Sequence, residues 1–190
     1  MTDAPPPLDT ARIIATFDHY QVDYILVGGV AARVYGAARL TEDFDCLARR
    51  TRENLACVAR ALADLGARLR VEGLTDIEAK ALPVRLEPET LGAMELSTWR
   101  TDAGDVDILT ELPARDGTRR RYDDLAEHAV TIRIDGVHVR VAGLDDIIDS
   151  KRWANRPKDH DALPELETLA AQGRDYREPC DDVGDAPELA

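Results

Sequence analysis

The sequence predicts an α/β (α+β) fold, in which a small mixed sheet is flanked by helices and followed by a short C-terminal helical extension. Three observations predict it. A short apolar run, Tyr24–Val27, ends in a Gly28-Gly29 turn and precedes an alanine-rich helical stretch. Two later segments have the alternation and turn residues of β-hairpins. Apolar residues recur at helical spacing between these strands and again after residue 143.

Length and composition suit one domain. The chain has 190 residues, of which 44% are hydrophobic, so it is long enough to bury a core. No run approaches the ~18–20 apolar residues of a membrane span. The first ten residues lack the basic and apolar regions of a secretory signal, and three widely spaced cysteines (Cys46, Cys57 and Cys180) do not form a disulfide or zinc pattern. We therefore expect a cytoplasmic protein.

The net charge of −13 disfavours long-range attraction to nucleic acid. A nucleic-acid substrate would need a local basic face, and the first candidate for one is Arg119–Arg121. Part of the net charge, −4, lies in residues 173–190, which predict an acidic disordered tail. We expect an unordered segment over 1–8, a core domain over 9–142 and a helical segment over 143–172.

The first half of the chain predicts alternating helices and strands. Asp9 is a candidate cap for a helix over Thr10–Tyr20. Gly66 favours a C-terminal stop near the end of the clearest helix. After the strand Tyr24–Val27, the expected elements are a helix over Val30–Leu40, a strand over Thr41–Leu47 and a helix over Thr51–Leu69.

The second half predicts two hairpins and a helix pair. One hairpin turns at residues 101–105, and the other turns at Asp135-Gly136, the stronger signal. The expected elements are a short helix over Ile77–Leu82, strands over Glu95–Arg100 and Val106–Leu109, a polar loop over Arg115–Arg121, a helix over Tyr122–Ala129, a hairpin over Thr131–Val141, and helices over Leu144–Asn155 and Asp159–Ala171, the last interrupted or initiated near Pro164.

Two carboxylates on the second predicted strand are the clearest chemical signal. Side chains alternate across a strand, so Asp43 and Asp45 share one face while Phe44 and Cys46 take the other. Hard carboxylate oxygens suit Mg²⁺, and the Gly28-Gly29 turn lets backbone N–H groups approach phosphate oxygens. The sequence therefore predicts a divalent metal held against a phosphate chain.

This pattern resembles the nucleotidyltransferase superfamily, the fold of DNA polymerase β, which has a glycine turn, a helix and then Asp-x-Asp on the next strand. Thirteen residues separate Gly29 from Asp43, a spacing within the range of that family. The resemblance implies a third carboxylate on a later strand, which we assign to Asp107, with Asp105 as the rival. It also implies Mg²⁺, with two sites, and an NTP substrate whose phosphates contact Gly28 and Gly29.

The C-terminal segment Asp149–Leu166 narrows the resemblance from the superfamily to one of its branches. A helical lysine followed by Arg-x-Lys-Asp and a further Asp is similar to the AbiEii-type (type IV toxin) branch, which includes the MenT toxins. The resemblance makes Lys151 the residue that contacts the triphosphate, with Asp161 beside the nucleotide, while Lys158 and Asp159 brace the helix pair. Arg39 and Thr41 match the Arg-x-Thr that precedes Asp-x-Asp in this branch, and Arg39 either contacts a phosphate or pairs with Glu42.

The expected catalytic set is therefore Asp43, Asp45, Asp107 and Lys151. The leading hypothesis is transfer of NMP from an NTP to a tRNA 3′ end, by a toxin held in check by a cognate antitoxin. One alternative keeps the same residues with a small hydroxylated acceptor, as in aminoglycoside or lincosamide nucleotidyltransferases. The other is an inactive member that binds a nucleotide or a partner protein.

The remaining aromatic and imidazole side chains favour structural roles. Trp99 and Trp153 are expected in the core or at a rim rather than as base-stacking platforms. No metal-ligand spacing relates the four histidines, which are His19, His128, His138 and His160. His160 lies near the expected site, where a structural role is favoured.

Overall fold

The computed structural model describes residues 6–71, 73–82 and 84–173. Its main sheet has seven strands in the order β3-β4-β5-β2-β1-β9-β8. These strands are β1 (Tyr24–Leu26), β2 (Asp43–Ala48), β3 (Arg68–Leu69), β4 (Leu96–Thr101), β5 (Gly104–Leu109), β8 (Val130–Ile134) and β9 (Val137–Val141). The pairs β1–β9 and β2–β5 are parallel and the others antiparallel, so the sheet is mixed, as predicted.

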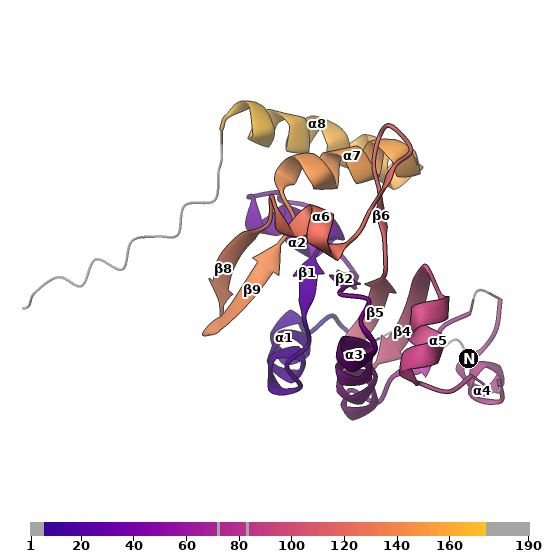
Figure 1. Ribbon diagram of the computed structural model, residues 1–190. Helices are drawn as coiled ribbons and strands as arrows, with labels where there is room; N and C mark the ends of the chain where they lie inside the picture. The colour runs from indigo at the N-terminus through magenta and orange to yellow at the C-terminus, as the bar shows by residue number, and fades with distance from the viewer. Residues whose placement is uncertain (1–5, 72, 83, 174–190) are drawn as a thin grey trace, which may run out of the picture.

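Helices flank this sheet, which confirms the predicted fold class. They are α1 (Thr10–His19), α2 (Gly28–Val34), α3 (Arg52–Asp64), α4 (Asp76–Lys80), α5 (Pro88–Ala93), α6 (Tyr122–Ala126), α7 (Leu144–Ala154) and α8 (Pro157–Ala171). A separate two-stranded pair joins β6 (Leu112–Pro113) to β7 (Arg119–Arg120). In Figure 1, α1 and α3 lie together below the sheet, whereas α7 and α8 lie side by side above it.

The core lies where the central strands meet α1 and α3. Phe44 on β2 is fully buried, and its ring packs edge-on against Phe17 of α1 with the centroids 5.9 Å apart. The apolar stripe of α3 and its C-cap residue is entirely buried; its members are Leu55, Val58, Leu62 and Leu65. Burial of one face of β2 against these helices fixes its register, because a shift by one residue would bring its carboxylates into the core.

Predicted caps and turns are confirmed at several element ends. The Asp9 carboxylate accepts a hydrogen bond from the backbone N–H of Arg12 at 3.0 Å, as a helix N-cap does. The second hairpin turns at Asp135 and Gly136, whose φ angles are +48° and +88°. Two successive residues with positive φ make the tight turn that matches the twist of paired strands.

Two predicted helices are shorter in the structure. The helix expected over Val30–Leu40 is α2, which ends at Val34 because Gly36 takes a φ of +100°. Leu40 lies outside the helix and is 81% exposed. The helix expected over Thr51–Leu69 is α3, which ends before Gly66, a predicted stop that is confirmed by its φ of +68°.

Two further expectations are corrected. The polar loop expected over Arg115–Arg121 includes strand β7, which pairs with β6. The last helix does not start or break near Pro164. It begins at Pro157, where the Asp159 carboxylate accepts from the Arg156 backbone N–H at 3.3 Å, and it continues past Pro164. The N-cap, Arg156, lies eight residues before Pro164, so the proline falls inside the helix, where it removes one backbone hydrogen bond without ending the helix.

None of the helices in the described ranges combines the length and apolar character that crossing a bilayer requires. Two predicted segments fall mostly outside these ranges. They are the unordered N-terminus, of which residues 6–8 are described, and the acidic tail, of which residue 173 is described. Cys180 also lies outside the described residues.

Candidate active site

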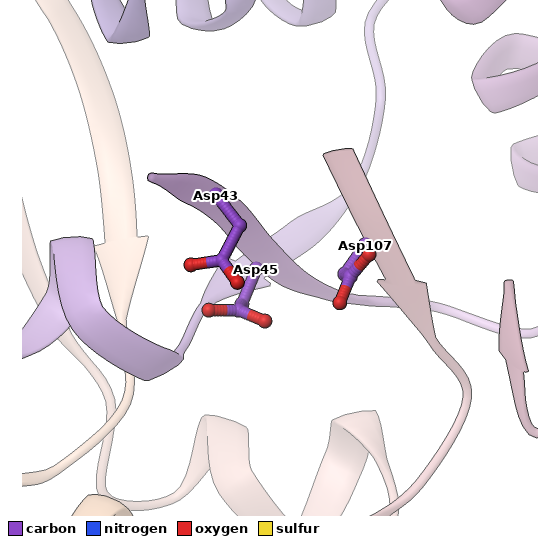
Figure 2. Close-up of side chains that lie close together, drawn as sticks. All are labelled: Asp43, Asp45 and Asp107. Atoms are coloured by element: carbon purple, nitrogen blue, oxygen red, sulfur yellow. The ribbon is translucent and has the colours of Figure 1, made fainter. Parts of the chain in front are cut away.

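Three aspartates from two neighbouring strands meet at one point of the sheet. Asp43 and Asp45 lie on β2, and Asp107 lies on β5, directly opposite Asp45 in the parallel pair. One oxygen from each carboxylate can be chosen so that all three lie within 4.8 Å of one another. Figure 2 shows the three side chains directed toward a common space between the two strands. Within the described ranges this is the only such group of three or more His, Cys, Asp or Glu residues.

Local structure explains why these carboxylates point together. Phe44 and Cys46, which alternate with them along β2, are fully buried on the opposite face. The Thr41 hydroxyl donates a hydrogen bond of 2.7 Å to Oδ1 of Asp43 and so fixes its orientation. Such a bond to a metal ligand typically supports both the position and the basicity of the ligand.

The electrostatics of the triad favour a bound cation. Burial, together with the charges of Asp43 and Asp107, raises the pKa of Asp45 to about 7. Burial also raises the pKa of Asp107, although a hydrogen bond from the Thr98 side chain opposes the shift. Oδ1 of Asp107 is buried and has no hydrogen-bond partner among the described residues. Close carboxylates with an unsatisfied oxygen are the donor set that a divalent metal such as Mg²⁺ requires.

Asp105, the rival for the third position, is occupied elsewhere. It faces the same side of β5 as Asp107, but its carboxylate accepts from Arg70 at 2.9 Å and from Arg100 at 3.2 Å. Its side chain is also 8% exposed. Asp105 is therefore a buried ion-pair partner, and the candidate metal-binding group consists of Asp43, Asp45 and Asp107.

The Gly28-Gly29 turn lies against this triad so closely that side chains are excluded. A Cβ atom on Gly28 would lie 2.0 Å from Oδ2 of Asp45, and one on Gly29 would lie 2.5 Å from Oγ1 of Thr41. The Gly29 backbone N–H donates a hydrogen bond to Asp45, which partly offsets the rise in the pKa of that carboxyl group. The turn therefore positions a metal ligand as well as bordering the site.

Gly28→Ala is expected to displace Asp45 and to destabilise the protein by about 2–4 kcal/mol, because it adds a steric clash to an unfavourable positive φ. Urea denaturation with and without Mg²⁺ measures both effects. Gly117→Ala is the matched control, since Gly117 has a φ of +83° with no atom within 4 Å of an added Cβ. Equal losses in the two variants would contradict the clash.

The triad forms part of a cleft of about 720 Å³ between the sheet and the α7–α8 pair. Every predicted nucleotide-binding residue except Asp161 lines this cleft; these are Gly28, Gly29, Arg39, Thr41 and Lys151. Asp161 lies at its edge, where it forms a 3.5 Å ion pair with Arg39. The expected alternative for Arg39, a pair with Glu42, is not found among the described ion pairs.

Basic side chains line the cleft from the first turn of α8 as well as from α7. Lys151 Nζ lies 3.3 Å from Oδ1 of Asp159, which is fully buried and also bonded to Arg156. Lys158, expected as a brace of the helix pair, is exposed and lines the cleft instead. Its charge lowers the pKa of Asp45, opposing the effect of burial. Sequence reasoning missed this role, since only the packing of α8 brings Lys158 toward β2.

The arginines at 119–121 do not form a free basic patch. Arg120 pairs with Asp146 and, at 3.4 Å, with Asp149. Arg121 pairs with Glu111 at 3.1 Å. Arg119 stacks its guanidinium on the Trp153 ring, with Cζ 4.8 Å from the ring centroid. Two of the three charges are therefore neutralised locally.

Neither a protein-family model nor a curated protein sequence matches this chain, but solved structures do. The lincosamide antibiotic adenylyltransferase LnuA, with lincomycin bound, is 14% identical with a TM-score of 0.53, over 86% of this chain and 99% of that one. ANT(2″)-Ia, in complex with adenylyl-2″-tobramycin, is 18% identical with a TM-score of 0.50, over 86% and 94%. These likenesses show that the chain has a nucleotidyltransferase fold.

Proposed function

We propose that this chain is an Mg²⁺-dependent nucleotidyltransferase, which transfers NMP from an NTP to an acceptor hydroxyl and releases pyrophosphate. The carrying observation is the group of three aspartates in a cleft of the nucleotidyltransferase fold. The acceptor oxygen attacks the α-phosphorus, the bond to the pyrophosphate oxygen breaks, and the hydroxyl proton passes to Asp107. Burial raises the pKa of Asp107, which makes it a stronger proton acceptor than a solvent-exposed carboxylate.

Asp43, Asp45 and Asp107 would hold the metal. Mg²⁺ supplies Lewis-acid chemistry, offsetting charge on the phosphate oxygens and lowering the pKa of the attacking hydroxyl. Lys151 and Lys158 approach from the opposite wall of the cleft, where their ammonium groups stabilise the negative charge of the leaving pyrophosphate. Thr41 and Gly29 hold the aspartates in position.

For the acceptor, two observations favour a small hydroxylated molecule. The solved structures of LnuA and ANT(2″)-Ia contain lincomycin and an adenylylated tobramycin. The segment Arg119–Arg121 also offers RNA little free positive charge, because Arg120 and Arg121 are ion-paired, and the chain has a net charge of −13. A tRNA 3′ end, with the toxin function implied by the sequence resemblance, is the second candidate; Lys151 and the segment that follows it support that resemblance.

Transfer of label from each α-labelled NTP tests both the reaction and the acceptor. The purified protein is incubated with Mg²⁺ and either total tRNA or a panel containing tobramycin and lincomycin. We expect label on one acceptor class, with none after EDTA treatment or in Asp107→Asn. Label on tRNA would favour the toxin hypothesis over the small-molecule acceptor. Nucleotide binding without transfer to any acceptor would instead indicate the inactive, binding-only member.

A further inference from the structure

The two tryptophans of the chain have opposite environments. Trp99 on β4 is 3% exposed, and its indole N–H donates to the Ser97 hydroxyl at 2.9 Å. Trp153 on α7 is 45% exposed and lines the cleft, where it is the only aromatic side chain among the described lining residues. The sequence favoured a core or rim position for both. Packing in the core accounts for the position of Trp99, whereas much of the Trp153 side chain is exposed to solvent.

The guanidinium of Arg119 lies over the Trp153 ring. Its Cζ atom lies 4.8 Å from the ring centroid, close enough for a cation–π contact. Arg119 has no ion pair among the described residues, unlike Arg120 and Arg121. The stack joins β7 to α7 within the lining of the cleft, so the indole is held in place while part of its surface remains free for contact.

Other apolar surface is exposed around the same cleft. Six large hydrophobic side chains are exposed in the described ranges, and half of them line this cleft, namely Leu40, Leu96 and Trp153. Exposed apolar groups gathered in a cleft indicate a ligand with an apolar face. The carboxylates and lysines account for the phosphates of an NTP, but they offer no surface to its base.

We propose that Trp153, supported by Arg119, is the stacking platform for the nucleobase of the NTP, an inference that rests on the proposed function. Lys151 and Trp153 of α7 both line the cleft, so one helix contributes an ammonium group for phosphate and an aromatic ring for the base. Stacking on an aromatic face tolerates every base. The platform therefore increases affinity for all four NTPs without selecting one of them.

The test compares nucleotide binding with binding of inorganic tripolyphosphate, which has the phosphates but no base. Affinities for ATP, CTP, GTP and UTP are measured by calorimetry with Mg²⁺ in the wild-type protein, Trp153→Ala and Trp153→Phe. We expect Trp153→Ala to weaken NTP binding roughly 5- to 150-fold, the range for loss of one aromatic–base stack, and to leave tripolyphosphate binding unchanged. Trp153→Phe should retain most of the affinity.

Fluorescence provides a second readout. NTP should quench tryptophan emission in the wild-type protein but not in Trp153→Phe, where the buried Trp99 is the only tryptophan, and tripolyphosphate should quench neither. Equal NTP affinity in Trp153→Ala and wild type would overturn the proposal, and so would an equal loss for tripolyphosphate, which would indicate a structural role. Failure of the wild-type protein to bind either probe would instead count against the proposed function.

Discussion

Asp45→Asn is expected to lower nucleotidyl transfer by at least about 1,000-fold and yet to stabilise the metal-free protein. The loss of transfer follows because the amide removes one of the three carboxylates that would hold the metal and so removes charge stabilisation at the reacting phosphate. The gain in stability is expected above about pH 7, where Asp45 is ionised although it is buried beside Asp43 and Asp107. A neutral isostere avoids that repulsion.

The sign of the pH dependence follows from the direction of this shift. Burial and the neighbouring aspartates raise the pKa of Asp45 from 3.8 to about 7. The folded state therefore holds this proton more tightly than the unfolded state. Its contribution to stability is fully present below about pH 4 and is lost as pH rises to about 7. At pH 8 the ionised group costs at most about 4 kcal/mol, which Asp45→Asn would recover in part.

Urea denaturation of the metal-free wild type and Asp45→Asn between pH 4 and pH 8 measures this effect. The stability difference between the two should grow with pH, and Mg²⁺ should stabilise only the wild type. Asp105→Asn is the matched control, because that carboxylate accepts hydrogen bonds from Arg70 and Arg100. It should lose about 1–3 kcal/mol. A less stable Asp45→Asn at pH 8 would refute the like-charge account.

The sequence predicted those parts of the structure that depend on local pattern. Alternation along β2 placed Asp43 and Asp45 on one face, and the structure confirms this because Phe44 is fully buried on the other. The turn at Asp135-Gly136 was predicted because its two positive φ angles need particular residue types. The early end of α2 at Val34 was missed, since apolar spacing continues to Leu40 and the stop depends on the backbone of Gly36.

Contacts between separate helices and strands could not be predicted from the sequence. The choice between Asp105 and Asp107 could not be made from the strand pattern, because both lie on one face of β5. The position of Arg70, which pairs with Asp105, decides it. Lys158 was likewise misplaced, since its approach to Asp45 depends on how α8 packs over the sheet. Such contacts join residues far apart in the chain and have no signature in local spacing.

Lys151 and Lys158 are expected to support transfer in different ways that mutation can separate. Lys151→Ala removes a partner of the fully buried Asp159 carboxylate, so it should cost about 1–2 kcal/mol of stability as well as about 100-fold or more in transfer rate. Lys158 is exposed and has no ion pair among the described residues. Lys158→Ala should therefore leave stability within about 0.5 kcal/mol while lowering transfer at least about tenfold.

The pH profile distinguishes the two lysines further. Lys158 lowers the pKa of Asp45, so Lys158→Ala should raise that pKa, and both Mg²⁺ binding and transfer should then require a higher pH than in the wild type. Arg152→Ala is the control, because Arg152 follows Lys151 on α7 but pairs with Glu167 at 2.8 Å and does not line the cleft. It should retain the wild-type rate and pH profile. An unchanged profile in Lys158→Ala would remove Lys158 from the electrostatic environment of Asp45, and full transfer in Lys151→Ala would remove Lys151 from the site.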